Sequence, residues 1–95
     1  MIGVLTHHWA KLDCVWEADL ALKGNGVAQS NAPGFVERKT MYSLNDETQI
    51  TSLVIWDNEE IYEKWRASPE RANTMAGANS LWSKPPESDR FRLAE

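Results

Sequence analysis

The hydrophobic and polar residues at the start of the chain predict a β-strand over residues 2–9. Apolar side chains fall on both faces of this strand, with Ile2 and Val4 on one face and Leu5 and Trp9 on the other. Successive side chains of a strand point to opposite faces, so the two adjacent histidines of this segment must face opposite ways.

In residues 11–24 the apolar residues recur at helical spacing, which predicts a helix. The apolar stripe of this predicted helix consists of Leu12, Val15, Trp16 and Leu20. The sequence GNG at residues 24–26 predicts the end of the helix, because glycine and asparagine commonly stop helices. We expect residues 27–32 to resume a short helix before the Pro-Gly turn that follows.

Two strands joined by a tight turn follow. Residues 35–46 mix apolar and polar side chains on each face, and the sequence NDE turns the chain into a strand over residues 48–57. That strand ends in a continuous apolar run from Leu53 to Trp56. A strand that is apolar on both faces is covered on both faces.

A second helical segment begins at a polar cap, which Asp57 or Asn58 can supply. Asp57 and Glu60 have the spacing of a capping box. The inner stripe of this helix is Ile61, Tyr62 and Trp65. A restart is predicted at Ser68, a capping residue, with Pro69 at the first helical position. The side chains expected to continue inward are Ala72, Met75 and Ala76.

Residues 89–94 predict a last short strand, after a linker-like SKPPESD segment at residues 83–89. The order strand, helix, strand, strand, helix, strand predicts one α+β domain over residues 1–95, a ferredoxin-like βαββαβ plait with an antiparallel sheet. In that topology the first and third strands are central, and the helices cover one face only. A second copy packed sheet to sheet is the simplest cover for the other face, which predicts a homodimer.

Composition and charge narrow the class of protein. In 95 residues the chain carries 42% hydrophobic residues and five tryptophans, more than a small core easily encloses, which favours a ligand pocket or an interface. The formal net charge of −4 argues against nucleic acid as a partner. We expect no signal peptide or membrane span, and the single cysteine, Cys14, is typical of a reducing compartment. The expected location is the cytoplasm.

Three segments in the middle of the chain carry a resemblance to a known family. They are PGF at residues 33–35, VIWDNEEIYEKW at residues 54–65 and SPE at residues 68–70. Together they resemble the antibiotic biosynthesis monooxygenase family of dimeric α/β-barrel proteins. The resemblance implies a dimer whose sheets pack together, with a mostly apolar pocket between sheet and helices in each subunit. Activities reported in the family include oxygenation of aromatic polyketides without a metal or flavin, and oxidative breakdown of haem, so the fold alone does not name a reaction.

The resemblance also assigns the pocket wall. Trp65 matches a tryptophan that lines the pocket in several relatives, whereas burial alone would suit a core indole equally well. The residues expected to contact substrate are Trp65, Ile61, Tyr62 and Met75. Some quinone-forming relatives place an asparagine and a tyrosine at positions that align with Ile61 and Arg71, so their mechanism is not matched residue for residue.

Haem-degrading relatives imply a different set of residues. They carry a histidine after the pocket tryptophan on the same helix and an asparagine on the first strand. In this chain, Thr74 or Met75 aligns with that histidine, and His7 or its neighbour aligns with that asparagine. Because neither residue of the relatives is present, haem degradation is disfavoured. Haem binding through a histidine of the first strand remains an alternative.

Oxygenation without a cofactor requires a dry cavity, a base and a donor for the developing oxyanion. His7 and His8 are the only histidines, and imidazole is the side chain whose ordinary pKa suits a base at neutral pH. Alignment of the strand end with the family that the chain resembles favours His7 as the residue that faces the pocket. Histidines on opposite faces of a strand form no metal site, so no metal is expected.

The leading expectation is therefore oxidation of a small phenol or hydroquinone in an apolar pocket, without a bound cofactor. One alternative is a haem-binding or haem-degrading protein with a displaced ligand. Another is a non-catalytic dimeric protein that binds a small apolar ligand.

Overall fold

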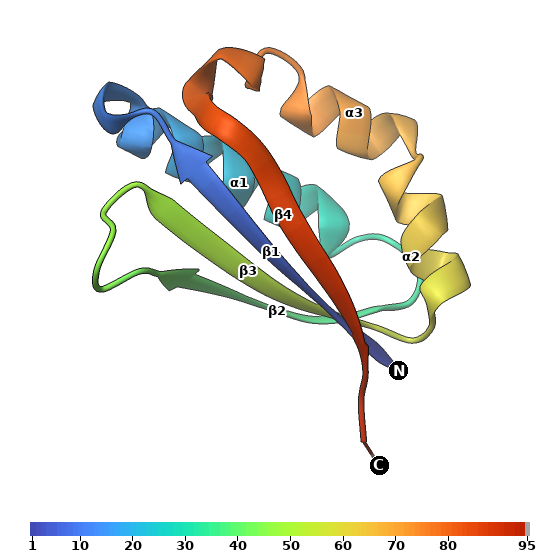
Figure 1. Cartoon of the computed structure of the whole chain (residues 1–95). Helices are drawn as coiled ribbons and strands as arrows, with labels where there is room; N and C mark the ends of the chain where they lie inside the picture. The colour runs from blue at the N-terminus through green and yellow to red at the C-terminus, as the bar shows by residue number, and fades with distance from the viewer. Residues whose placement is uncertain (95) are drawn as a thin grey trace.

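The computed structural model describes residues 1–94 and contains a four-stranded antiparallel sheet with helices on one face (Figure 1). The strands are β1 (Ile2–Ala10), β2 (Phe35–Tyr42), β3 (Gln49–Trp56) and β4 (Trp82–Arg92). The helices are α1 (Val15–Gln29), α2 (Glu59–Arg66) and α3 (Pro69–Met75), with single 3-10 turns at Leu12–Cys14 and Asn79–Leu81. The strand order β2-β3-β1-β4 is that of the ferredoxin-like plait and confirms the predicted fold class, with β1 and β3 in the centre.

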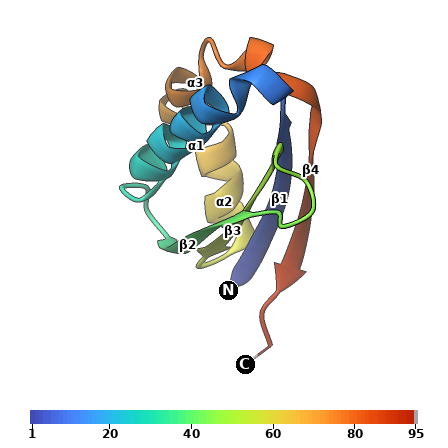
Figure 2. The same ribbon diagram turned by 90° about the vertical axis from the view of Figure 1, so that its left-hand side faces the viewer.

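The helices all lie on the same face of the sheet (Figure 2). Strand pairing identifies the side chains beneath them, because Val4 lies opposite Val54 and Thr6 opposite Ser52 in the pairing of β1 with β3. The core between the two layers consists of two clusters. One contains Val4, Val54, Trp56 and Trp65, and the other Ala10, Ala18, Leu22 and Ile50. Among residues 1–94, no helix has both the length and the apolar character needed to cross a bilayer.

Helix α1 continues through the predicted stop at Gly24 and ends at Gln29. The buried side of this helix is formed by Ala18, Leu22, Asn25 and Gln29, whereas the predicted inner residues Leu12, Trp16 and Leu20 are exposed. Asn25 accepts a hydrogen bond from Thr74 Oγ1 at 2.9 Å, and Gly26 lies beneath the Arg38 side chain. These tertiary contacts outweigh the low helix propensity of the GNG sequence.

Strand β4 begins at Trp82, so the segment predicted as a linker is part of the strand. The partners of His7 and Trp9 on β4 are Glu87 and Lys84, which leaves one extra residue in β4 opposite His8. The bulge contains the two prolines of the PP sequence. Because β4 is an edge strand, proline there interrupts no central ladder, which explains why a sequence typical of a linker forms a strand.

The caps of the short helices match the sequence closely. The Asn58 side chain accepts a hydrogen bond from the Ile61 backbone N–H at 2.9 Å, so Asn58 rather than Asp57 is the cap of α2. Ser68 caps α3, as predicted. The inward pattern of α3 holds only for Met75, because Ala72 and Ala76 are exposed in this short helix.

Candidate active site

A cavity of about 270 Å³ lies between the sheet and the three helices. Its volume is near the lower end of the range for small-ligand sites. Every strand and every helix contributes to its walls. The sheet supplies Val4, Thr6, His8, Arg38, Ser52, Val54, Pro86, Ser88 and Arg90, and the helices supply Leu22, Asn25, Gln29, Tyr62, Trp65, Arg66, Arg71 and Met75.

The two histidines face opposite sides of the sheet, as the strand period predicts. His8 lines the cavity, whereas the His7 Nδ1 lies 2.7 Å from Thr51 Oγ1, on the face without helices. The preference for His7 as the pocket residue is therefore wrong. The reason is the phase of β1: His8 is in step with Val4 and Thr6, which also line the cavity.

His8 has an unusual environment. Neither ring nitrogen has a hydrogen-bond partner among residues 1–94, and Nδ1 is sealed from solvent, so Nε2 is the nitrogen available to a ligand. Burial lowers the pKa of His8 from 6.5 to about 4, and repulsion from Arg38, Arg71 and His7 adds to this effect. The imidazole is thus neutral at physiological pH. Its basicity is weaker than that of the near-neutral base that the sequence predicts.

The predicted wall residues divide between two hollows. Trp65, Tyr62 and Met75 line the cavity beside His8. Ile61 instead lines a second hollow of about 660 Å³ between the end of α1 and α2, and Trp65 separates the two. The side chain of Ile61 packs on Gly34, where the backbone has φ of +81° and an added Cβ would lie 2.8 Å from Ile61 Cδ1.

The cavity is also lined by four arginines that were not predicted from the sequence to lie there: Arg38, Arg66, Arg71 and Arg90. The cavity is therefore more polar than the resemblance implies. A signal was available for Arg38 and Arg90, because the predicted topology brings the strands of both residues into one sheet. Arg38 is paired with Val54 and Arg90 with Val4, on the face covered by helices.

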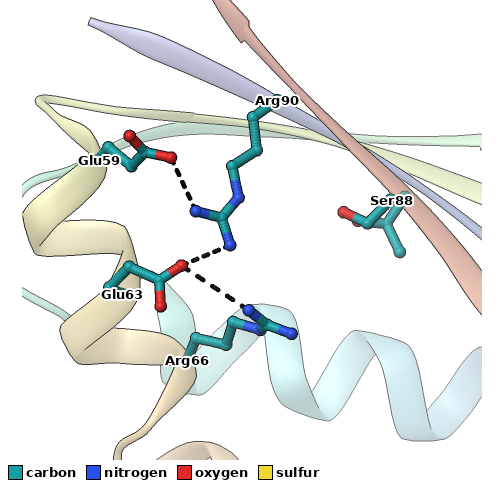
Figure 3. Close-up of polar contacts among 6 residues, drawn as sticks. Glu59, Glu63, Arg66, Ser88 and Arg90 are labelled. Carbon is teal, nitrogen blue, oxygen red and sulfur yellow. Dashed lines mark hydrogen bonds and ion pairs between the residues drawn. The ribbon is translucent and has the colours of Figure 1, made fainter.

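Arg90 joins β4 to α2 in a network that also contains Arg66 (Figure 3). The Arg90 Nη1 lies 2.8 Å from Glu59 Oε2, and the same guanidinium pairs with Glu63. Arg66 also approaches Glu63, with 3.7 Å between Nη1 and Oε1. The Arg90 guanidinium carbon lies 4.9 Å from the centre of the Tyr62 ring, so this network fixes one wall of the cavity.

The two positions where the resemblance places a haem-ligating histidine carry no histidine here. The Thr74 hydroxyl is engaged by Asn25 and by the Arg71 carbonyl, and Met75 packs against the core. Within residues 1–94, no three His, Cys, Asp or Glu side chains are grouped so as to hold a metal ion.

Comparison with known proteins extends over the whole fold. SnoaB, a cofactor-independent oxygenase from Streptomyces nogalater, superposes with a TM-score of 0.83 at 12% identity, covering 99% of this chain and 94% of that chain. Rv0793 from Mycobacterium tuberculosis superposes with a TM-score of 0.87 at 13% identity, covering 99% of this chain and 95% of that chain. A conserved protein from Methanosarcina mazei Go1 superposes with a TM-score of 0.88 at 17% identity, covering 98% of this chain and 92% of that chain. At these identities the likeness establishes the fold.

Sequence comparison gives the family. None of the curated proteins matches the chain. The family model described as antibiotic biosynthesis monooxygenase matches residues 1–77, which include β1, the three helices and the strands between them. The chain therefore belongs to the antibiotic biosynthesis monooxygenase family.

Proposed function

We propose that the protein is a cofactor-independent monooxygenase that oxidises a small phenol or hydroquinone, with His8 as the proton acceptor. The observation that carries the proposal is the neutral His8 side chain in the wall of the cavity, with Nε2 available to a ligand. Trp65 and Tyr62 supply aromatic surface in the same cavity. The family and the fold shared with SnoaB, a cofactor-independent oxygenase, support this reaction class.

The substrate itself supplies the electrons in this chemistry. His8 accepts the phenolic proton, and the phenolate transfers one electron to O₂. The resulting radical and superoxide combine at the para carbon, and His8 returns the phenolic proton to the peroxide to give a hydroperoxide. Cleavage of the O–O bond releases hydroxide, which takes up the para C–H proton and leaves as water. For 1-naphthol the balance is 1-naphthol plus O₂ giving 1,4-naphthoquinone plus water.

The positive charge of the cavity assists the first step. The charges that disfavour a protonated His8 also stabilise a phenolate, so they lower the pKa of the substrate. Proton transfer then becomes feasible from the substrate side although His8 is a weak base. The acid limb of the kcat/KM profile is accordingly expected near pH 4, set by the lowered pKa of His8, rather than near 6.5.

Turnover under ¹⁸O₂ tests this function. With 1-naphthol, one labelled oxygen is expected in the quinone and the other in water. His8→Gln is expected to lower kcat by about a hundredfold or more, the usual contribution of a general base. His7→Gln, on the opposite face of β1, is expected to stay within about twofold of the wild type. A wild-type protein that forms no labelled quinone from 1-naphthol or related phenols would contradict the proposal.

We propose further that the face of the sheet without helices is a homodimer interface. Leu5 lies opposite Leu53 across β1 and β3 on that face, and Phe91, on β4, is 52% exposed. A Cβ added at Gly3 would contact Leu53 and Ile55 at 3.4–3.5 Å, so these side chains lie together at its centre. Burial of such an apolar sheet face against a second copy is favourable.

A charge at the centre of this face tests the dimer. The wild-type protein is expected to show twice the chain mass in size-exclusion chromatography with light scattering. Leu53→Lys is expected to shift it to the monomer, because a dimer would bury the ammonium group without a partner. Leu20→Lys, at a 50% exposed position on α1, serves as the control and is expected to stay dimeric. A monomeric wild-type protein would refute the interface.

A further inference from the structure

The four arginines of the cavity form two pairs that differ in their partners. Arg66 and Arg90 form ion pairs with glutamates of α2 (Figure 3). Arg38 donates from Nη1 to the neutral amide oxygen of Gln29 at 2.8 Å. The Arg71 guanidinium has no hydrogen-bond or ion-pair partner among residues 1–94. Two positive charges of the cavity are therefore not balanced by carboxylates of the described chain.

These two charges are partly withdrawn from water. Arg38 and Arg71 are both half-buried, and burial lowers the pKa of the Arg38 guanidinium, which nevertheless stays charged at neutral pH. Gly26 leaves room for Arg38 to lie against α1, since an added Cβ would be 3.0 Å from the Arg38 Nε. A buried charge without a counter-charge is unfavourable, and a bound anion would offset that cost.

The two guanidinium groups act on one place in the cavity. Arg38 and Arg71 are the two arginines whose repulsion lowers the pKa of His8, and all three side chains line the cavity. The chain as a whole has a formal net charge of −4. The positive character is therefore local to the cavity and does not reflect a basic surface.

We propose that Arg38 and Arg71 bind a carboxylate of the substrate, which makes the ligand a hydroxylated aromatic acid rather than a neutral phenol. This inference rests on the proposed function, because it names the substrate class of the same cavity. A guanidinium presents paired N–H donors that match a carboxylate, while Trp65 and Tyr62 offer aromatic surface to the ring.

Binding of two ligands of nearly the same shape tests the inference without turnover. By titration calorimetry at pH 7 and low salt, 2-naphthoate is expected to bind at least about tenfold more tightly than the neutral 2-naphthamide. Arg71→Gln is expected to remove most of this preference by weakening the binding of 2-naphthoate. Arg92→Gln, an exposed position of β4 outside the cavity, serves as the matched control and should keep the preference. Arg38→Gln is the second variant and is expected to reduce the preference in the same way. Circular dichroism verifies its fold.

Equal affinity for naphthoate and naphthamide, or an unchanged preference in Arg71→Gln, would overturn the inference. Acetate binding as tight as that of naphthoate would overturn its aromatic part. The proposed function fails separately, since charge-selective binding without oxidation of 1-hydroxy-2-naphthoate would refute the reaction and leave the anion site standing. Equal kcat/KM for 1-naphthol and 1-hydroxy-2-naphthoate would refute the anion site and leave the reaction standing.

Discussion

Acidifying the protein from pH 7 to pH 4 is expected to lower its free energy of unfolding by roughly 3 kcal/mol through His8 alone. The pKa of His8 is about 4 in the folded chain, against an ordinary value of 6.5. Between these values the unfolded chain binds a proton that the folded chain does not, so unfolding takes up a proton and acid favours it. The loss begins below about pH 6.5 and is complete near pH 4.

Urea unfolding at pH 7, 6, 5 and 4 measures this effect. His8→Gln is expected to remove the contribution and leave a flatter dependence of stability on pH. His7→Gln is expected to retain most of it, because His7 is the smallest of the causes that lower the pKa of His8. Equal slopes in the wild type and His8→Gln would show that the imidazole is solvated in the folded protein.

Replacing Trp56 by alanine is expected to lower the free energy of unfolding by about 3–5 kcal/mol, enough to unfold much of a small domain. Trp56 is fully buried, and its ring centre lies 5.9 Å from those of Phe35 and Tyr62 and 6.3 Å from that of Trp65. The variant leaves a void at the centre of an aromatic cluster, and loss of the neighbouring Trp65 contact also loosens the cavity wall.

Two further variants separate packing from the polar atom of the indole. The Trp56 Nε1 is buried and has no partner among residues 1–94, so Trp56→Phe removes an unsatisfied donor and is expected to cost much less than alanine. Trp16→Ala, at a position 67% exposed on α1, is expected to change stability by less than about 0.5 kcal/mol. Urea unfolding monitored by circular dichroism measures all three. A cost at Trp16 as large as that at Trp56 would contradict this assignment of the core.

The sequence contained enough information for the fold because the strand and helix periods are strong where the core is apolar. The apolar run before Trp56 identified a central strand, and the Ser68 and Pro69 pair located the restart of the second helical segment. The prediction failed where a tertiary contact overrides local preference. Asn25 reads as a helix stop, but its bond to Thr74 of α3 is not visible in any local pattern.

The site was predictable only in part. Strand geometry required one histidine on each face, and the structure meets that requirement, but the phase of β1 relative to the cavity needed the packed helices. Arg38, Arg66 and Arg90 were missed because each reads singly as a solvated surface charge, whereas Arg71 was aligned with a tyrosine of quinone-forming relatives but was not assigned to the cavity wall. Only the sheet register and the packing of α3 bring Arg38 and Arg71 to the same cavity.

The proline bulge of β4 has a consequence for the behaviour of the protein in concentrated solution. Pro85 and Pro86 lack backbone N–H groups and lie in the middle of an edge strand, opposite His8. A strand of another molecule that approaches this edge meets an interrupted row of N–H donors and a local kink, which disfavours edge-to-edge extension of the sheet. The same bulge that places Pro86 in the cavity wall is therefore expected to oppose cross-β aggregation.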